Sequence, residues 1–262
     1  MLKSSLKSII ESIGIYKTSS SDAAYFRERP RDPFLHQQYL INSHYKKVTT
    51  IFDIGSFIGN TVDKYRSLFP EATIYSFEPF PESYKKLGER FEADNLVKRF
   101  NAAVADKAGT RQFFVRGRND ANSLLPSVTA GQRYDHTEAA TINTVIDVPV
   151  TTIDDVCRKE SLPEIQVLKM DMEGGELMAL RGAMDMLSQH LIGLIYTEVT
   201  FVPHNQDEPL FHEIVEFLSS YGYTLFDIYS IIRARNGQVR RADTIFVSPQ
   251  LREVVDALDP MP

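Results

Sequence analysis

The chain has 262 residues, 43% of them hydrophobic, which is enough for a substantial core in one large domain or two small ones. Its net charge of -6 and pI near 5.6 argue against a nucleic-acid partner or a membrane surface, which usually require a basic face. Cys157 is the single cysteine, so internal disulfides and multi-cysteine zinc sites are excluded, and a reducing compartment, by default the cytoplasm, is expected.

Residues 1–47 are expected to form an N-terminal helical segment that caps the domain. One helical stripe within it has the pattern of a helix packed on the domain or on a second subunit, which is compatible with a homodimer. A helix lying on a membrane surface is the less favoured alternative. No stretch of the chain is long enough to span a bilayer, and the apolar segment is too short for a secretory signal. The stripe consists of Leu2, Leu6, Ile9, Ile10 and Ile13.

From residue 48 onward, short apolar runs alternate with helical patterns, which is typical of a parallel sheet with helices on its faces. Strands are expected at residues 50–54, 73–77, 98–104, 165–170, 191–199, 224–228 and 244–247. Four helical faces lie between them: Val62, Tyr65, Leu68 and Phe69; Tyr84, Leu87 and Phe91; Leu177, Leu180, Met184 and Leu187; and Phe211, Ile214, Val215 and Leu218. The fold class is therefore predicted to be α/β.

A long polar segment at residues 116–145 separates the strand-like TRQFFVR from DVPVTTIDDV. Loops of this length are uncommon in compact domains and are often binding elements, although disorder is the alternative. The segment is interpreted as an acceptor-binding insertion. Its arginines, Arg116, Arg118 and Arg133, either contact an anionic acceptor or belong to a solvated loop.

The first strand ends in TIFDIGSFIGNT, a turn at the position where open α/β sheets bind ligands. Gly55 lets the backbone turn without a Cβ clash, and Gly59 is expected to let a ligand approach closely. The spacing matches neither the dinucleotide loop GxGxxG nor a P-loop, so no phosphate is required. Asp53 places a carboxylate before the turn, which indicates a ligand with a cationic amine.

The second strand ends at Glu78, where a carboxylate can accept both hydroxyls of a ribose. Pro79 then stops the strand. A ligand with an amine, a ribose and no required phosphate matches S-adenosylmethionine, whereas NAD would need the missing phosphate loop. Alternatively, Glu78 starts a loop and Asp53 caps a turn, but their register on successive strands favours the ligand site.

Five segments resemble the FkbM family of S-adenosylmethionine-dependent methyltransferases: FDIGSFIGNT, YSFEPFPESYKKL, FNAAVAD, TTIDDV and, above all, VLKMDMEGGELMALRGA. The resemblance covers about residues 48–247, with the motifs in order. It implies a class I, Rossmann-like methyltransferase domain over residues 48–262, with a seven-stranded, mostly parallel sheet, helices on both faces and an antiparallel last strand. It also implies a hydroxyl oxygen as methyl acceptor, often on a sugar or a polyketide-type natural product.

Matching positions give the implied S-adenosylmethionine site. Its residues are Asp53, Gly55, Ser56, Phe57, Gly59, Asn60, Glu78, Pro79 and Asp171, with Asn101 or Ala102 approaching the adenine. Asn122 and Ser123 resemble a polar element that precedes the acceptor pocket in this family, and Glu173 is assigned to the acceptor with them.

Acidic residues follow two of the later strands. Asp171 and Glu173 come just beyond residues 165–170, Glu198 ends the next strand, and His204 follows in a loop, so the four could converge above the methyl group. Because methyl transfer is an in-line displacement, the enzyme mainly aligns the acceptor and helps to remove its proton. Asp171 or His204 is the expected base, although Asp171 could simply begin a helix.

A divalent cation held by Asp171, Glu198 and His204 could instead acidify the hydroxyl, but these residues form no tight ligand motif and the metal is not favoured. The predicted protein is an O-methyltransferase that acts on a carbohydrate, glycan or other hydroxylated small molecule. The alternatives are an NAD-dependent oxidoreductase and a non-catalytic cofactor-binding module on the same fold.

Overall fold

The computed structural model describes residues 32–127 and 141–258. The apolar stripe expected between Leu2 and Ile13 and the middle of the predicted insertion, with Arg133, lie outside the described residues. Within those two ranges, no helix combines the length and apolar character needed to cross a membrane.

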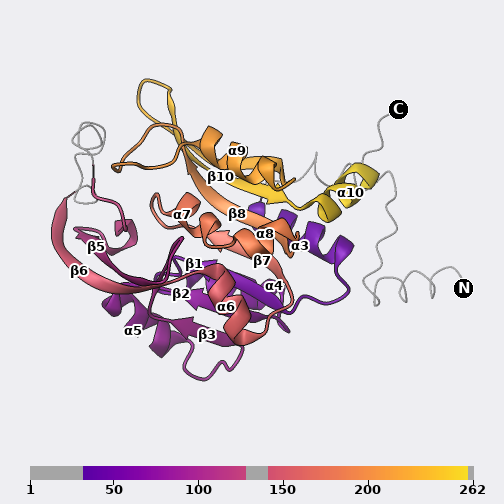
Figure 1. Ribbon diagram of the computed structural model, residues 1–262, viewed down its shortest axis with the longest axis horizontal. Helices are drawn as coiled ribbons and strands as arrows, with labels where there is room; N and C mark the ends of the chain where they lie inside the picture. Colours follow the sequence, from indigo (N-terminus) through magenta and orange to yellow (C-terminus); the bar gives the residue numbers. More distant parts are fainter. Residues whose placement is uncertain (1–31, 128–140, 259–262) are drawn as a thin grey trace, which may run out of the picture.

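A seven-stranded sheet runs through the molecule in the order β3-β2-β1-β7-β8-β10-β9 (Figure 1). Every neighbouring pair from β3 to β8 is parallel, and β10 is antiparallel to both β8 and β9. The strands are β1 Thr50–Ile54, β2 Thr73–Phe77, β3 Val97–Phe100, β7 Ile165–Met170, β8 Ile192–Thr200, β9 Thr224–Arg233 and β10 Val239–Val247. This confirms the predicted class I methyltransferase architecture, including the reversed last strand.

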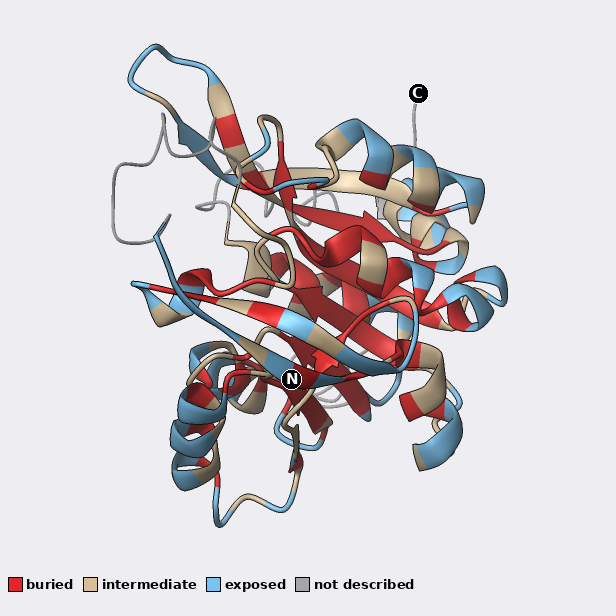
Figure 2. Cartoon of the chain, turned by 60° about the vertical axis from the view of Figure 1, so that its left-hand side comes forward, coloured by how far each residue is buried: buried red, intermediate tan, exposed pale blue. Residues whose placement is uncertain are grey.

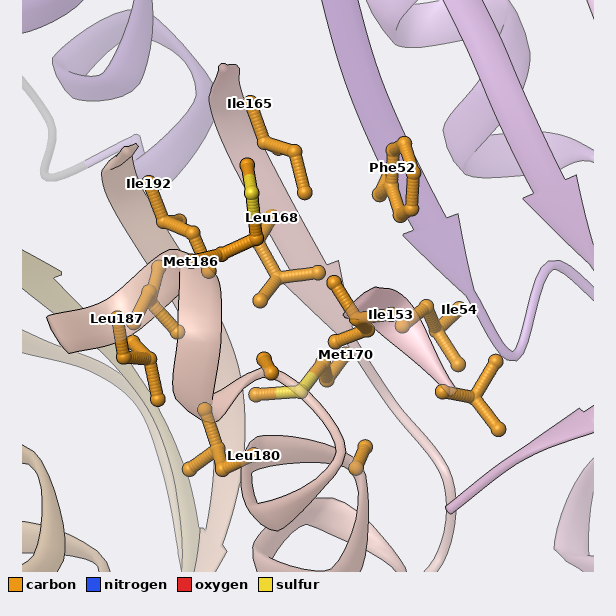
Figure 3. Packing of buried hydrophobic residues seen from close by; sticks show 14 of the residues in the cluster. Phe52, Ile54, Ile153, Ile165, Leu168, Met170, Leu180, Met186, Leu187 and Ile192 are labelled. Carbon is orange, nitrogen blue, oxygen red and sulfur yellow. The ribbon is translucent and has the colours of Figure 1, made fainter. Parts of the chain in front are cut away.

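The central strands β1 and β7 are buried at every residue, and because successive side chains point to opposite sides of a sheet, both faces are covered there. Ile51 packs on one side, while Phe52 and Ile54 pack on the other with Leu168 and Met170 (Figure 3). In Figure 2 the sheet is buried and the outer faces of the helices are exposed. The first side is covered by α3 Pro33–His44, α4 Asn60–Leu68, α5 Pro81–Arg90 and α10 Pro249–Leu258, and the second by α6 Ile153–Glu160, α7 Glu176–Arg181, α8 Met184–Ser188 and α9 Phe211–Ser220.

The third predicted helical face is wrong at Met184, which is 48% exposed. The chain forms two short helices there, α7 and α8, instead of one. The break falls at Gly182, where a Cβ atom would lie only 2.1 Å from the carbonyl oxygen of Ala105. The close approach of these two backbones therefore ends α7 earlier than its apolar pattern predicts.

The strand predicted at residues 98–104 is divided between two sheets. After β3 the chain turns at Asn101 and Ala102, and β4 Ala103–Val104 pairs with β6 Ile142–Thr151, which also pairs with β5 Gly109–Arg116. The β5 and β6 strands form a curved arm beside the main sheet (Figure 1). The insertion expected at residues 116–145 thus overlaps the end of β5 and the beginning of β6. The helical turn η1 Asn119–Ala121 follows β5.

Candidate active site

A cavity of about 210 Å³ lies at the carboxyl ends of β1, β2 and β7. The turn after β3 and the segment around η1 complete its wall. In the sheet order, β1 lies between β2 and β7, so the chain reverses its direction of winding here. This is the position at which open α/β sheets bind their ligands.

The loop after β1 forms one side of the cavity and is tied to the end of β2. The amides of Gly55 and Ser56 both donate to the carbonyl of Phe77, at 3.1 and 3.0 Å. Gly55 has a φ of +75°, and a Cβ atom on it would lie 1.8 Å from the carbonyl oxygen of Asp171. Glycine is therefore required for the loops after β1 and β7 to meet. Phe57 and Asn60 continue the same wall.

Glu78 lines the cavity with a carboxylate that is almost completely buried, at 6% exposure. Its Oε2 accepts the amide of Phe57 at 2.9 Å and its Oε1 accepts the amide of Phe80 at 2.8 Å. Burial raises the pKa of Glu78 to about 7. Because each carboxylate oxygen has two lone pairs, both can accept a further hydrogen bond from a ligand.

The remaining predicted cofactor residues lie in the turns beside Glu78, where some line the cavity and one supports its wall. Pro79 and Ala102 line the cavity. Asn101 does not; its Nδ2 donates to the carbonyls of Glu78 and Pro79, at 2.9 and 3.1 Å. Asn101 therefore holds the turn that presents Glu78.

Asp53 lies beneath the cavity rather than in its wall. Its side chain is fully buried, and its Oδ1 is 2.9 Å from the Nζ of Lys169. Lys169 also donates to the carbonyl of Gly55 at 2.9 Å. Burial alone would lower the pKa of Lys169, but the negative charges of Asp53, Asp171 and Glu78 and the hydrogen bond to Asp53 together outweigh it, and the pKa is raised. In contrast to the expectation from the sequence, the amine that meets Asp53 belongs to the protein.

Gly59 is also absent from the cavity wall. It precedes α4 with a φ of +89°, and a Cβ atom there would lie 2.3 Å from the ring of Phe91. The close approach that was expected for a ligand is made by the side chains of Phe91 and Leu87. The glycine therefore serves the packing of α4 on α5.

Three carboxylates predicted to converge do so: oxygens of Asp171, Glu173 and Glu198 lie within 4.8 Å of one another. Asp171 is exposed and lines the cavity with Glu173, whereas Glu198 lies outside the cavity wall. Arg241 of β10 completes the group, with its Nη1 3.3 Å from both Glu173 and Glu198. Burial raises the pKa of Glu173 to about 7 and the pKa of Glu198 well above its usual range. A guanidinium group thus contacts Glu198, one of the three ligands of the metal hypothesis, together with Glu173.

Glu173 has a left-handed backbone, with φ of 53°, which is unfavourable for a residue with a side chain. Its carbonyl accepts the Oγ of Ser123 at 2.8 Å and the Nδ2 of Asn205 at 2.9 Å. Ser123 is fully buried and is absent from the cavity wall, to which its hydroxyl is joined through Glu173, while Asn122 lines the cavity directly. Of the three predicted acceptor residues, two therefore reach the cavity and one supports it.

His204 and Arg116 lie away from the positions that the sequence suggested for them, whereas Arg118 is exposed, as in the solvated-loop alternative. His204 is absent from both the cavity wall and the carboxylate group, and its amide donates to Glu208. Arg116 is buried and donates to the carbonyls of Ala121 and Leu125, at 2.6 and 3.1 Å. Arg118 pairs with Asp120. Arg116 therefore holds the arm together, whereas Arg118 makes a local ion pair at the surface.

Sequence reasoning missed Lys169 and Arg241. A lysine within the apolar strand IQVLKM was a signal, because it stands beside Asp53 in the parallel pairing of β1 and β7. That signal is visible only once β1 and β7 are known to be neighbours. Arg241 carries no comparable local signal, since it belongs to the charged beginning of a strand.

The strand order with its reversed β10, together with a cavity at the carboxyl ends of β1, β2 and β7, defines a class I methyltransferase. Residues 53–225 match the family model of the methyltransferase FkbM domain. The chain therefore belongs to the FkbM family of S-adenosylmethionine-dependent methyltransferases.

Two named relatives have similar sequences. The 2-O-methyltransferase NoeI of Sinorhizobium fredii is 25% identical over 191 residues, which are 71% of this chain and 77% of that protein. Methyltransferase sdnD of Sordaria araneosa is 26% identical over 195 residues, 66% of this chain and 69% of that protein. Among solved structures, precorrin-6y C5,15-methyltransferase of Geobacter metallireducens is similar with a TM-score of 0.44 and 10% identity, covering 82% of this chain and 87% of that one.

Proposed function

We propose that this protein transfers the methyl group of S-adenosylmethionine to a hydroxyl oxygen of a neutral carbohydrate or a comparable hydroxylated small molecule. The observation that carries the proposal is one cavity whose wall contains both a buried carboxylate, Glu78, and an exposed one, Asp171. Glu78 suits a ribose, and Asp171 suits the removal of a proton.

The cavity fits S-adenosylmethionine better than a dinucleotide on grounds of charge. Its wall contains four carboxylates, those of Glu78, Asp120, Asp171 and Glu173, of which Asp120 pairs with Arg118 and Glu173 with Arg241, and its lysine, Lys169, is paired with Asp53. This wall complements a ligand with a sulfonium and an ammonium group and repels a pyrophosphate. Glu78 would hold the ribose hydroxyls, and Pro79 and Ala102 offer apolar surface for the adenine.

When bound, the cofactor would supply a methyl group on a positively charged sulfur, and the carbon–sulfur bond would break as the methyl carbon bonds to the acceptor oxygen. The protein's part is to orient the acceptor and to take its proton. Asp171 is our choice for the base, because it is an exposed carboxylate of the cavity wall, whereas Asp120 pairs with Arg118 and His204 lies outside that wall. Glu173 and Asn122 would contact the acceptor beside it.

The same contacts support a neutral acceptor over an anionic one. Arg116 and Arg118 were candidates for a phosphate or carboxylate, but the first donates to carbonyls of its own arm and the second pairs with Asp120. Arg241 pairs with Glu173 and Glu198. The name of NoeI, a 2-O-methyltransferase, supports oxygen as the atom that is methylated.

The test is isothermal calorimetry with S-adenosylhomocysteine and NAD, followed by incubation of labelled S-adenosylmethionine with a panel of methyl glycosides. We expect the first ligand to bind and a neutral glycoside to be methylated. Binding of NAD alone would favour the oxidoreductase. Binding of S-adenosylhomocysteine with no methylated product, from the panel or from fractionated hydroxylated extracts, would favour a non-catalytic module.

Asp171→Asn tests the base. We expect it to lower turnover about 100-fold to 10,000-fold and to leave the affinity for S-adenosylhomocysteine within about threefold. Asp185→Asn is the matched control, because Asp185 is an exposed acid of α8 outside the cavity wall. Equal turnover of Asp171→Asn and wild type would exclude Asp171 as the base.

A further inference from the structure

Arg241 reaches the carboxylates of Glu173 and Glu198 from an unusual direction. It lies near the beginning of β10, which runs opposite to the other strands at this edge, and it pairs with Thr200 at the end of β8. Its Nη1 lies 3.3 Å from Oε2 of Glu173 and 3.3 Å from Oε1 of Glu198. One guanidinium group therefore joins a carboxylate of the cavity wall to a carboxylate behind it.

Glu173 is consequently held at both ends. Ser123 and Asn205 bind its carbonyl and maintain the left-handed backbone, while Arg241 binds its carboxylate. Backbone strain of this kind persists only where the surroundings over-determine the conformation, and it is concentrated at functional sites. The backbone contacts fix where the side chain starts, and the contact with Arg241 fixes where it ends.

The charges around Glu173 make that last contact decisive. Acidic groups face it from three directions, namely Asp171 after β7, Glu198 of β8 and Glu208 before α9, while Arg116 of β5 contributes a positive charge. Burial alone would lower the pKa of Arg241, but Glu198 and Glu173 outweigh it and the pKa is raised, so the guanidinium stays charged. Without it, the pKa of Glu173 would rise further, and Glu173 would either be repelled by the neighbouring carboxylates or take up a proton.

We propose that Arg241 is a positioning residue that holds the carboxylate of Glu173 in the cavity wall, beside Asp171, so that it can bind the acceptor. This inference rests on the proposed function and extends it to a strand beyond the family match, which ends at residue 225. An exposed ion pair would have little effect on activity, but Arg241 is 30% exposed and spans two carboxylates, of which Glu198 is only 16% exposed.

The first arm of the test needs no acceptor. Arg241→Ala leaves a gap between Glu173 and Glu198, and we expect methylguanidinium to bind this variant saturably in calorimetry. We expect no such binding to wild type or to Arg241→Ala combined with Glu173→Gln. Arg233→Ala is the control, because Arg233 is an exposed arginine on β9 that donates to the carbonyl of Gly237.

The second arm measures methyl transfer with the methyl glycoside that wild type uses best. We expect Arg241→Ala to lower kcat/KM for the acceptor about 100-fold, to keep its affinity for S-adenosylhomocysteine within about threefold, and to regain about tenfold in methylguanidinium. A residue that only stabilises the fold would not be rescued in this way.

Either of two results would overturn the inference: wild-type turnover by Arg241→Ala, or a loss of cofactor affinity as large as the loss of kcat/KM. Failure of methylguanidinium to bind Arg241→Ala would also count against it. Absence of methyl transfer by wild type would instead contradict the proposed function, and the titration would still show whether Arg241 holds Glu173.

Discussion

Replacing Glu78 by glutamine should weaken cofactor binding by a predictable amount. The two carboxylate oxygens already accept amides at 2.9 and 2.8 Å, and the remaining lone pairs face two ribose hydroxyls in our proposal. Glutamine keeps one oxygen and puts an NH₂ group in place of the other. Losing one hydrogen bond to a charged group costs about 1.5–3 kcal/mol. The affinity for S-adenosylhomocysteine should therefore fall about 10-fold to 150-fold.

The raised pKa of Glu78, about 7, adds a dependence on pH. Hydroxyl donors need the ionised carboxylate, so affinity should be greatest above pH 7 and should fall as Glu78 takes up a proton. At pH 6 about one tenth of the carboxyl groups would be ionised, and binding should be about tenfold weaker than at the plateau. In Glu78→Gln this dependence should disappear.

Calorimetric titration of S-adenosylhomocysteine between pH 5.5 and 8.5 measures both effects at once. Glu82→Gln, at an exposed position in the first turn of α5, is the control and should retain wild-type affinity and pH dependence. Two results would refute the reasoning: wild-type affinity that is constant across this range, or Glu78→Gln binding as tightly as wild type.

Two further predictions concern the cations of the site. Asp53→Asn leaves Lys169 buried without its partner and should lower the free energy of unfolding, measured in urea, by about 3–5 kcal/mol. Because Asp53 and Lys169 form one pair, the double variant with Asp53→Asn and Lys169→Met should lose less free energy of unfolding than the two single variants lose in sum. Strictly additive losses would contradict the pairing. Dialysis against EDTA should leave methyl transfer within about twofold, because Arg241 already lies between Glu173 and Glu198. A loss that Mg²⁺ reverses would show that a metal is needed.

The fold was predictable to the extent that it is encoded locally. The bounds of β1, β2 and β7 follow from apolar runs that end at glycine, proline or acidic residues. The break between α7 and α8 was not predictable, because the apolar spacing continues through it and the constraint comes from the distant carbonyl of Ala105. Periodicity reports which face is apolar, not which backbone passes close by.

The same distinction applies to the cavity. Gly55 and Glu78 were found because each stands at the end of a predicted strand, where position alone gives a functional meaning. Asp53 was assigned to a ligand because its partner could not be seen: Lys169 lies beside it only when β1 and β7 are adjacent. Arg241 required both the order and the direction of β10.

The position of β10 also bears on how the chain assembles during synthesis. β10 follows β9 in the sequence but lies between β8 and β9 in the sheet. Until the ribosome has released it, β8 and β9 have no bridging partner, and each would expose an unpaired edge that favours aggregation. The strand that carries Arg241 thus joins β9 to the sheet and brings Arg241 to Glu173 and Glu198 in a single step. In our proposal, a nascent chain would cover the edge of β8 and complete its acceptor site at the same moment.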